Sequence, residues 1–93
     1  MSLNIFDCHE DMVKSDPEYK KEYEALAFEY VVARALIEAR TAAGFTQQDI
    51  ARKLGITQPA VARIESGKNV SLKTLQRYAN AVGRKISLEI NPL

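Results

Sequence analysis

The residues of this chain that can do chemistry are hydrogen-bonding and basic side chains rather than nucleophiles or metal ligands. The single histidine, His9, lies beside the single cysteine, Cys8, near the start of the 93 residues. A structural zinc site needs four ligands, so this pair predicts no metal site. Neither a glycine-rich phosphate loop nor a Ser/His/Asp constellation can be assembled, so we expect no catalytic residue, no enzymatic activity and no cofactor. What remains is the stretch from Thr46 to Gly67, which combines glutamine, arginine and lysine.

The stretch from Thr46 to Gly67 predicts two short helices joined by a tight turn. Thr46 and Thr57 are good N-caps, because their side-chain oxygens can accept a backbone N–H of the first turn. Gly55 and Gly67 stand where each helix should stop, since glycine adopts the left-handed backbone conformation of a helix end most easily. Apolar residues recur at helical spacing in both helices: Ile50, Ala51, Leu54, Val61 and Ile64. Helices this short bury little surface alone, and the pair is typical of a helix-turn-helix that lays its second helix in a DNA major groove.

The spelling T-Q-Q-D-I-A-R-K-L-G-I-T-Q-P-A-V-A-R-I-E-S-G resembles the DNA-binding domain of lambdoid phage repressors and their bacterial relatives. The resemblance covers about Arg40 to Gly83. It implies a partly buried structural salt bridge between Arg40 and Glu65. It also implies that Gln47 binds a phosphate and supports the second, recognition helix, and that Gln58 contacts adenine through two hydrogen bonds. The residues that the resemblance places on DNA are Gln47, Thr57, Gln58, Pro59, Ala60, Arg63, Lys68, Asn69 and Ser71.

The remaining DNA contacts implied by the resemblance are less specific. Pro59 and Ala60 can meet thymine methyl groups, and Arg63 can take a guanine or a phosphate. The loop residues Lys68, Asn69 and Ser71 are expected to touch the DNA backbone. Because Pro59 and Ala60 stand where phage repressors often have polar residues, we expect the deformability of the operator to carry part of the specificity.

Charge is distributed unevenly along the chain. The overall net charge is +1, yet residues 1–33 hold eight acidic side chains against three lysines, a net charge of −5. Residues 34–93 hold ten Lys or Arg side chains against four acidic ones, a net charge of +6. The helix-turn-helix lies in the basic part of the chain, as the binding of DNA phosphates requires. The acidic part would repel DNA and suggests a second partner of opposite charge.

The N-terminal third predicts an arm followed by a long helix. Residues 1–14 show no clear period, and we interpret them as a frayed terminus or an arm that orders on a partner. A helix start follows, with either Ser15 or Asp16 as the N-cap before Pro17. Residues 17–43 contain no further Gly or Pro, so they form one helix or two broken near the middle. An unbroken helix would be ~40 Å long, too long to lie wholly against so small a domain.

One stripe of apolar residues runs along this long helix. Tyr19, Tyr23, Leu26, Tyr30, Ala33 and Ile37 recur at spacings of three and four, whereas Phe28 and Val31 lie off the stripe. The second half of the helix, from Val32, should be the first helix of the repressor-like domain, with Leu36 and Ile37 in its core. The first half projects beyond it. Its stripe either packs within the domain or a dimer, or binds a partner.

The C-terminal quarter predicts a further helix and then a strand. Ser71 caps a helix whose inner face should be Leu72, Leu75, Tyr78, Ala79 and Val82, and Gly83 ends it. Ile86, Leu88 and Ile90 then alternate with polar residues, which predicts a half-buried strand. The backbone of a lone strand needs a partner, so we expect antiparallel pairing with a second copy across a two-fold axis. The alternative is a disordered tail.

The string R-A-L-I-E-A-R-T-A-A-G-F-T-Q at Arg34 to Gln47 resembles the HigA-type antitoxins of bacterial toxin–antitoxin pairs. The resemblance implies a homodimer that represses its own operon at a palindromic operator. It also implies that the protein silences a RelE/ParE-like toxin, and a segment of net −5 suits a basic partner. We expect toxin contacts at Tyr19, Tyr23, Leu26, Phe28 and Tyr30. The alternative is a free-standing phage or plasmid-type repressor without a toxin.

These patterns predict an all-α fold, a lambda-repressor-like helix-turn-helix domain with an extended N-terminal helix and a short C-terminal dimerisation strand. The predicted divisions are residues 1–14 (arm), 15–31 (helical extension), 32–83 (DNA-binding domain) and 84–93 (dimerisation strand). No apolar run approaches the ~20 residues that span a bilayer. The lack of a signal-peptide pattern and the single cysteine favour a cytoplasmic location.

Overall fold

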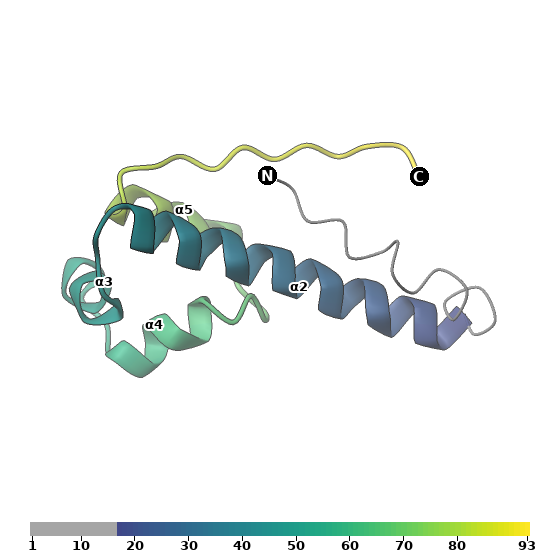
Figure 1. Ribbon diagram of the computed structural model, residues 1–93, viewed down its shortest axis with the longest axis horizontal. Coiled ribbons are helices and arrows are strands. Elements are labelled where there is room, and N and C mark those ends of the chain that lie inside the picture. Colours follow the sequence, from purple (N-terminus) through teal and green to yellow (C-terminus); the bar gives the residue numbers. More distant parts are fainter. Residues whose placement is uncertain (1–16) are drawn as a thin grey trace.

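The computed structural model describes residues 17–93, and the predicted arm, Cys8, His9 and both candidate N-caps lie outside that range. The described part consists of helices joined by short turns and followed by an extended tail (Figure 1). The helices are α2 (Pro17–Ala42), α3 (Gln47–Leu54), α4 (Gln58–Ile64) and α5 (Leu72–Ala81). No strand occurs within residues 17–93, so the predominantly helical fold is confirmed and the C-terminal strand is not.

Helix α2 is a single unbroken helix of 26 residues. At 1.5 Å per residue it is about 39 Å long, and its first half extends beyond the other helices (Figure 1). Of the two alternatives left open by the sequence, the structure therefore has one continuous helix. None of the helices between residues 17 and 93 is long and apolar enough to span a membrane.

Local capping fixes the helix-turn-helix. The Thr46 hydroxyl accepts the Asp49 N–H at 3.1 Å, and the Asp49 carboxylate accepts the Thr46 N–H at 2.8 Å, which closes a capping box at the start of α3. Gly55 ends α3 in the left-handed conformation, with φ of 69°. Thr57 then caps α4 by accepting the Ala60 N–H at 3.3 Å. The turn between α3 and α4 therefore takes only residues 55–57.

The core lies where α2, α3, α4 and α5 meet. Its buried members are Leu36, Ile50, Ala51, Val61, Tyr78 and Val82. Two residues assigned to it from the sequence lie outside: Ile37 is 39% exposed and Leu72 is 64% exposed. Ile37 follows Leu36 by 100° around the helix, so the packing of α2 can bury only one of them fully. Leu72 is the first residue of α5, where the helix begins beyond the edge of the core.

The segment after α5 is extended but forms no strand. Ile86 is 40% exposed, Leu88 67% and Ile90 88%. The alternating pattern predicted a strand, yet a strand is defined by hydrogen bonds to a neighbour, and the described part of this one chain offers no second strand. The expected dimerisation strand thus stays a prediction about two copies of the chain.

Candidate nucleic-acid interface

Helix α4 presents one face to solvent, which combines polar and small apolar residues. Gln58, Pro59, Ala62 and Arg63 are exposed, while Val61 is fully buried on the opposite side. These four positions recur at spacings of one, three and four and so share one face of the helix. A helix seated in a major groove through this face would turn Gln58 and Arg63 toward the base edges.

Two alanines of α4 differ in their exposure to solvent. Ala60 was expected to meet a thymine methyl group, but it is half-buried and lines the groove beside α5. Ala62 is the exposed alanine, and sequence reasoning missed it. The signal was present, because Ala62 lies four residues after Gln58 and therefore on the same face.

The loop between α4 and α5 places its polar residues beside this face. Lys68, Asn69 and Ser71 are all exposed. Asn69 has φ of 50°, a left-handed conformation that asparagine tolerates better than most residues. Ser71 caps α5, since its hydroxyl accepts the Thr74 N–H at 3.1 Å. That hydroxyl is engaged, so a phosphate at Ser71 would have to meet the backbone or share the hydroxyl.

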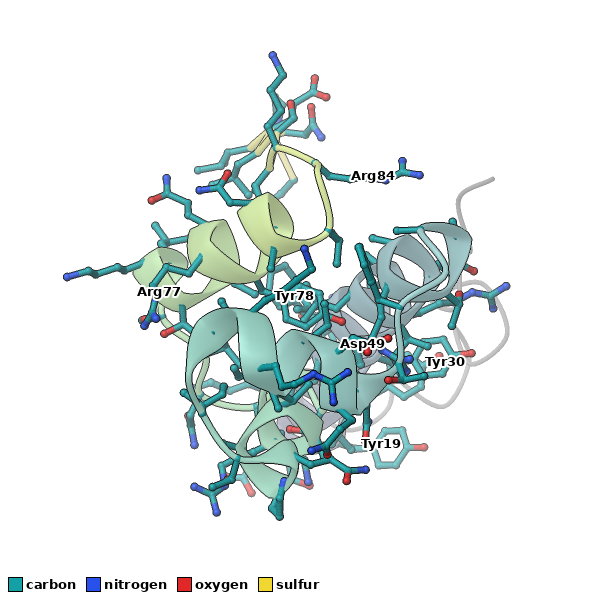
Figure 2. The ribbon with its side chains drawn as sticks, turned by 90° about the vertical axis from the view of Figure 1, so that its left-hand side faces the viewer. Tyr19, Tyr30, Asp49, Arg77, Tyr78 and Arg84 are labelled. Atoms are coloured by element: carbon teal, nitrogen blue, oxygen red, sulfur yellow. The ribbon has the colours of Figure 1, made fainter. Side chains whose placement is uncertain are left out.

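A groove of about 580 Å³ separates α4 and this loop from α5. Its floor is apolar, with Leu54, Ile56 and Ile64, and its lining also includes the basic residues Arg63, Lys68 and Arg77. Arg77 was not singled out from the sequence. Its guanidinium donates to the Leu54 carbonyl oxygen at 3.2 Å, which satisfies an end carbonyl of α3 (Figure 2). The three cations make this side of the domain electropositive, as a phosphate backbone requires.

A buried carboxylate joins all four described helices. Glu65, directly after α4, is 3% exposed. Arg40 of α2 donates from Nε to one carboxylate oxygen at 2.7 Å and from Nη2 to the other at 3.3 Å. Gln47 of α3 donates at 2.9 Å, and the Tyr78 hydroxyl of α5 donates at 2.6 Å. Figure 2 shows Tyr78 pointing in among the helices. The implied pair of Arg40 and Glu65 is therefore one part of a larger network.

Gln47 connects this buried network to the exposed face of α4. Its amide nitrogen donates to Glu65, and its amide oxygen accepts from Gln58 Nε2 at 3.4 Å. Gln47 itself is half-buried and Gln58 is exposed. The residue expected to support the recognition helix thus lies between the core and the first residue of that helix.

Burial or hydrogen bonding displaces the pKa values of three groups in and around the helix-turn-helix. Burial raises the pKa of the Tyr78 hydroxyl, and its hydrogen bond to the Glu65 carboxylate raises it further. Burial lowers the pKa of Arg40, but the hydrogen bonds and charge of Glu65 outweigh it, so the net pKa is raised. The Thr46 N–H, hydrogen-bonded to the carboxylate, lowers the pKa of Asp49. Each displacement favours the protonation state that makes the observed contacts.

Tyr78 should make the protein less stable at alkaline pH. Below about pH 10 the hydroxyl is protonated in both the folded and the unfolded chain. Above it the unfolded chain releases the proton first, because the folded pKa is raised. The free energy of unfolding should therefore fall as pH rises past 10. Urea denaturation at increasing pH should show a shallower fall for Tyr78→Phe than for the wild type or for Tyr30→Phe, which removes an exposed hydroxyl. Equal slopes in all three proteins would contradict the assignment.

The residues expected to contact a toxin lie along the projecting half of α2. Leu26, Phe28 and Tyr30 are 60%, 65% and 48% exposed. Tyr19 and Tyr23 are half-buried, and their rings stack with centroids 6.3 Å apart. Tyr19 and Tyr30 lie on the same side of α2 (Figure 2). Phe28 follows Leu26 by about 200° around the helix, so it lies on a different side and cannot join the same flat surface.

Within residues 17–93 no group of three or more His, Cys, Asp or Glu side chains is arranged to hold a metal ion.

The chain is similar to known DNA-binding proteins and to known antitoxins. A helix-turn-helix family model matches residues 36–88, which is more than half of the chain. Antitoxin HigA1 from two strains of Mycobacterium tuberculosis is 30% identical over 79 residues, which are 84% of this chain and 53% of the relative. The chain thus spans about half the length of the curated relatives it matches. No solved structure matches. The family match and the similarity to antitoxin HigA1 confirm the resemblances drawn from the sequence motifs.

Proposed function

The chain belongs to the helix-turn-helix family, and from that premise we propose that it is a dimeric, sequence-specific transcriptional repressor and the antitoxin of a toxin–antitoxin pair. The observation that carries the DNA-binding part is the exposed face of α4, with Gln58 and Arg63 turned to solvent beside a basic groove. The similarity to antitoxin HigA1 supports the second part.

In the proposed complex α4 enters the major groove. Gln58 contacts an adenine through two hydrogen bonds, and Arg63 contacts a guanine or a phosphate one turn further along. Pro59 and Ala62 complete the face and offer apolar contact to thymine methyl groups. Gln47 contacts a backbone phosphate, and Lys68, Asn69 and Ser71 also contact the DNA backbone. Thr57 contributes by starting α4 at the required position.

The proposed toxin surface is the side of α2 that carries Leu26 and Tyr30. Both side chains are large and about half exposed. They stand four residues apart, so they lie side by side on one face of the helix. Tyr19 and Tyr23 continue the same side toward the helix start. Residues 17–31 also carry four glutamates against two lysines, and that charge complements a basic, RelE/ParE-like toxin.

The proposed dimer contact is the tail after α5. Ile86, Leu88 and Ile90 are exposed in an extended segment whose backbone is open to pairing. Antiparallel pairing of two tails would bury these side chains and satisfy both backbones. A two-fold dimer of this kind matches a palindromic operator, whose half-sites are related by the same symmetry.

One experiment tests both activities. The tagged chain is purified from its native host, and the preparation is tested by gel shift on the DNA upstream of its own gene. We expect a shift on that DNA and a co-purifying small basic protein encoded beside the gene. Leu26→Lys together with Tyr30→Lys should lose the partner and keep the shift. Ala35→Lys is the control, because it places a lysine at an exposed position on another side of α2. A shift without such a partner would favour a free-standing repressor, and no shift would exclude the repressor.

Replacing Gln58 by alanine should relax sequence discrimination at one base step. The variant loses the amide that reads adenine, at a cost of about 1–3 kcal/mol per half-site on the specific duplex. Binding to random DNA should change little, since phosphate contacts carry it. Competition gel shifts with specific and random duplexes measure the affinity for each kind of DNA. The matched control is Gln48→Ala, an exposed glutamine in the first turn of α3. Equal weakening on both duplexes would contradict a base contact by Gln58.

A further inference from the structure

We propose that Glu65 is a positioning residue for base recognition, which acts through Gln47 to fix the end of the Gln58 amide that faces the DNA. The inference rests on the proposed insertion of α4 into the major groove. It concerns residues whose contacts lie entirely within the described chain. The three side chains form a continuous path, from a carboxylate that is 3% exposed, through a half-buried amide, to an exposed one.

The chemistry of the carboxylate sets the direction of this path. An ionised carboxylate only accepts hydrogen bonds. The Gln47 amide, 2.9 Å from Glu65 Oε1, must therefore turn its nitrogen toward the carboxylate. Its oxygen then faces the other way and accepts from Gln58 Nε2 at 3.4 Å. The orientation of both amides thus follows from one buried negative charge.

The charge itself is held firmly in place. Arg40 Nε and the Tyr78 hydroxyl both donate to Glu65 Oε2, at 2.7 and 2.6 Å. Gln47 uses the other oxygen, Oε1, which it shares only with the longer contact to Arg40 Nη2 at 3.3 Å. The two oxygens therefore have different roles: Oε2 anchors the carboxylate to α2 and α5, and Oε1 orients Gln47.

The consequence for recognition is a preference for adenine over guanine. With one N–H of Gln58 given to Gln47, its oxygen and its second N–H remain for the base edge. Adenine presents a donor and an acceptor in the major groove and matches this pair, whereas guanine presents two acceptors. If the amide could turn freely, Gln58 would offer either end to the groove and discriminate less well. Glu65 therefore contributes to specificity without touching the base.

The test compares adenine and guanine at a single base step. The probe is the duplex that the wild-type protein selects from a randomised library, with each adenine replaced in turn by guanine. For the wild type we expect one step at which the replacement weakens binding on the order of tenfold or more. Gln47→Met keeps the length of the side chain but breaks the path. The ratio of the affinities for the adenine duplex and the guanine duplex should therefore fall toward that of Gln58→Ala. Glu65→Gln should lower it as well, because a neutral amide can donate to or accept from Gln47.

Two controls separate orientation from general loosening. Gln48→Met makes the same chemical change at the neighbouring exposed position of α3. Tyr78→Phe removes a donor from the Oε2 side of the same carboxylate. Both should keep the wild-type ratio, even where Tyr78→Phe lowers stability. Should Glu65→Gln fail to fold, ¹⁵N relaxation of the Gln58 side-chain amide in DNA-free Gln47→Met decides instead, with greater mobility expected than in the wild type.

The outcomes distinguish this inference from the proposed function. A wild type that binds no duplex overturns the proposed function, and base recognition with it. Specific binding in which Gln47→Met keeps the wild-type ratio overturns only the positioning role. An equal loss of the ratio in Tyr78→Phe or Gln48→Met also overturns that role, because the effect would then not follow the path from Oε1 to Gln58.

Discussion

Replacing Arg40 by alanine should lower the free energy of unfolding by about 3–5 kcal/mol. The side chain of Arg40 is 13% exposed and that of Glu65 is 3% exposed, so the substitution leaves a carboxylate without its counter-charge in the core. It also leaves the Phe45 carbonyl oxygen without the N–H that Arg40 Nη1 donates at 3.0 Å. Gln47 and Tyr78 still donate to Glu65, and these hydrogen bonds limit the loss.

The matched control for this prediction lies on the same helix. Arg34 pairs with Glu38 at 2.8 Å, nearly the 2.7 Å between Arg40 and Glu65, but the two side chains are 46% and 63% exposed. Exposed pairs four residues apart on a helix contribute little to stability, because water and salt screen the two charges. Urea denaturation of Arg34→Ala and Arg40→Ala at neutral pH measures both losses. If the two variants lose similar stability, burial of the pair does not govern its contribution.

The helix-turn-helix could be predicted because its signals are local. Thr46, Gly55 and Thr57 act on the backbone within three residues of themselves, and the structure has their caps and turn where the sequence placed them. The contacts of Tyr78 and Gln47 with Glu65 could not be predicted in this way. They join residues 13 and 18 positions apart, and they depend on how three helices pack. The contact of Arg77 could not be predicted for the same reason, because the carbonyl that it binds is 23 residues away.

The spacing of apolar residues predicted where helices and extended segments lie better than it predicted which of their faces are buried. The stripe along α2 has a true helical period, but it does not say which side meets the core. Leu36 is buried and the adjacent Ile37 is 39% exposed, so the stripe that contains Ile37 lies to one side of the core. The alternation at Ile86, Leu88 and Ile90 likewise predicts an extended segment, and whether it becomes a strand depends on a partner that the sequence of one chain does not contain.

Gly67 should be the glycine of this chain that tolerates alanine least among those with described surroundings. Its φ of 74° costs an alanine about 1–2 kcal/mol. In addition, a Cβ there would overlap the carbonyl oxygen of Glu29 in α2 and lie 3.3 Å from the Ala33 nitrogen. Because these are backbone atoms of a continuous helix, they cannot rotate away, and the loop must move instead at about 1–3 kcal/mol. We expect Gly67→Ala to lose about 2–5 kcal/mol in all.

Gly55→Ala isolates the contact from the backbone strain. Gly55 has nearly the same φ, 69°, but no atom within 4 Å of the added Cβ. Its substitution should therefore cost only the strain, and thermal or urea denaturation of the two variants gives the difference. A displaced loop would also carry Lys68 and Asn69 away from α4, so Gly67→Ala should bind duplex DNA more weakly than Gly55→Ala at a temperature where both are folded. Equal stability of the two variants would show that the loop does not rest on α2 at Gly67. A larger loss in Gly67→Ala would show that the close approach of these two backbones fixes the position of Lys68 and Asn69 relative to α4.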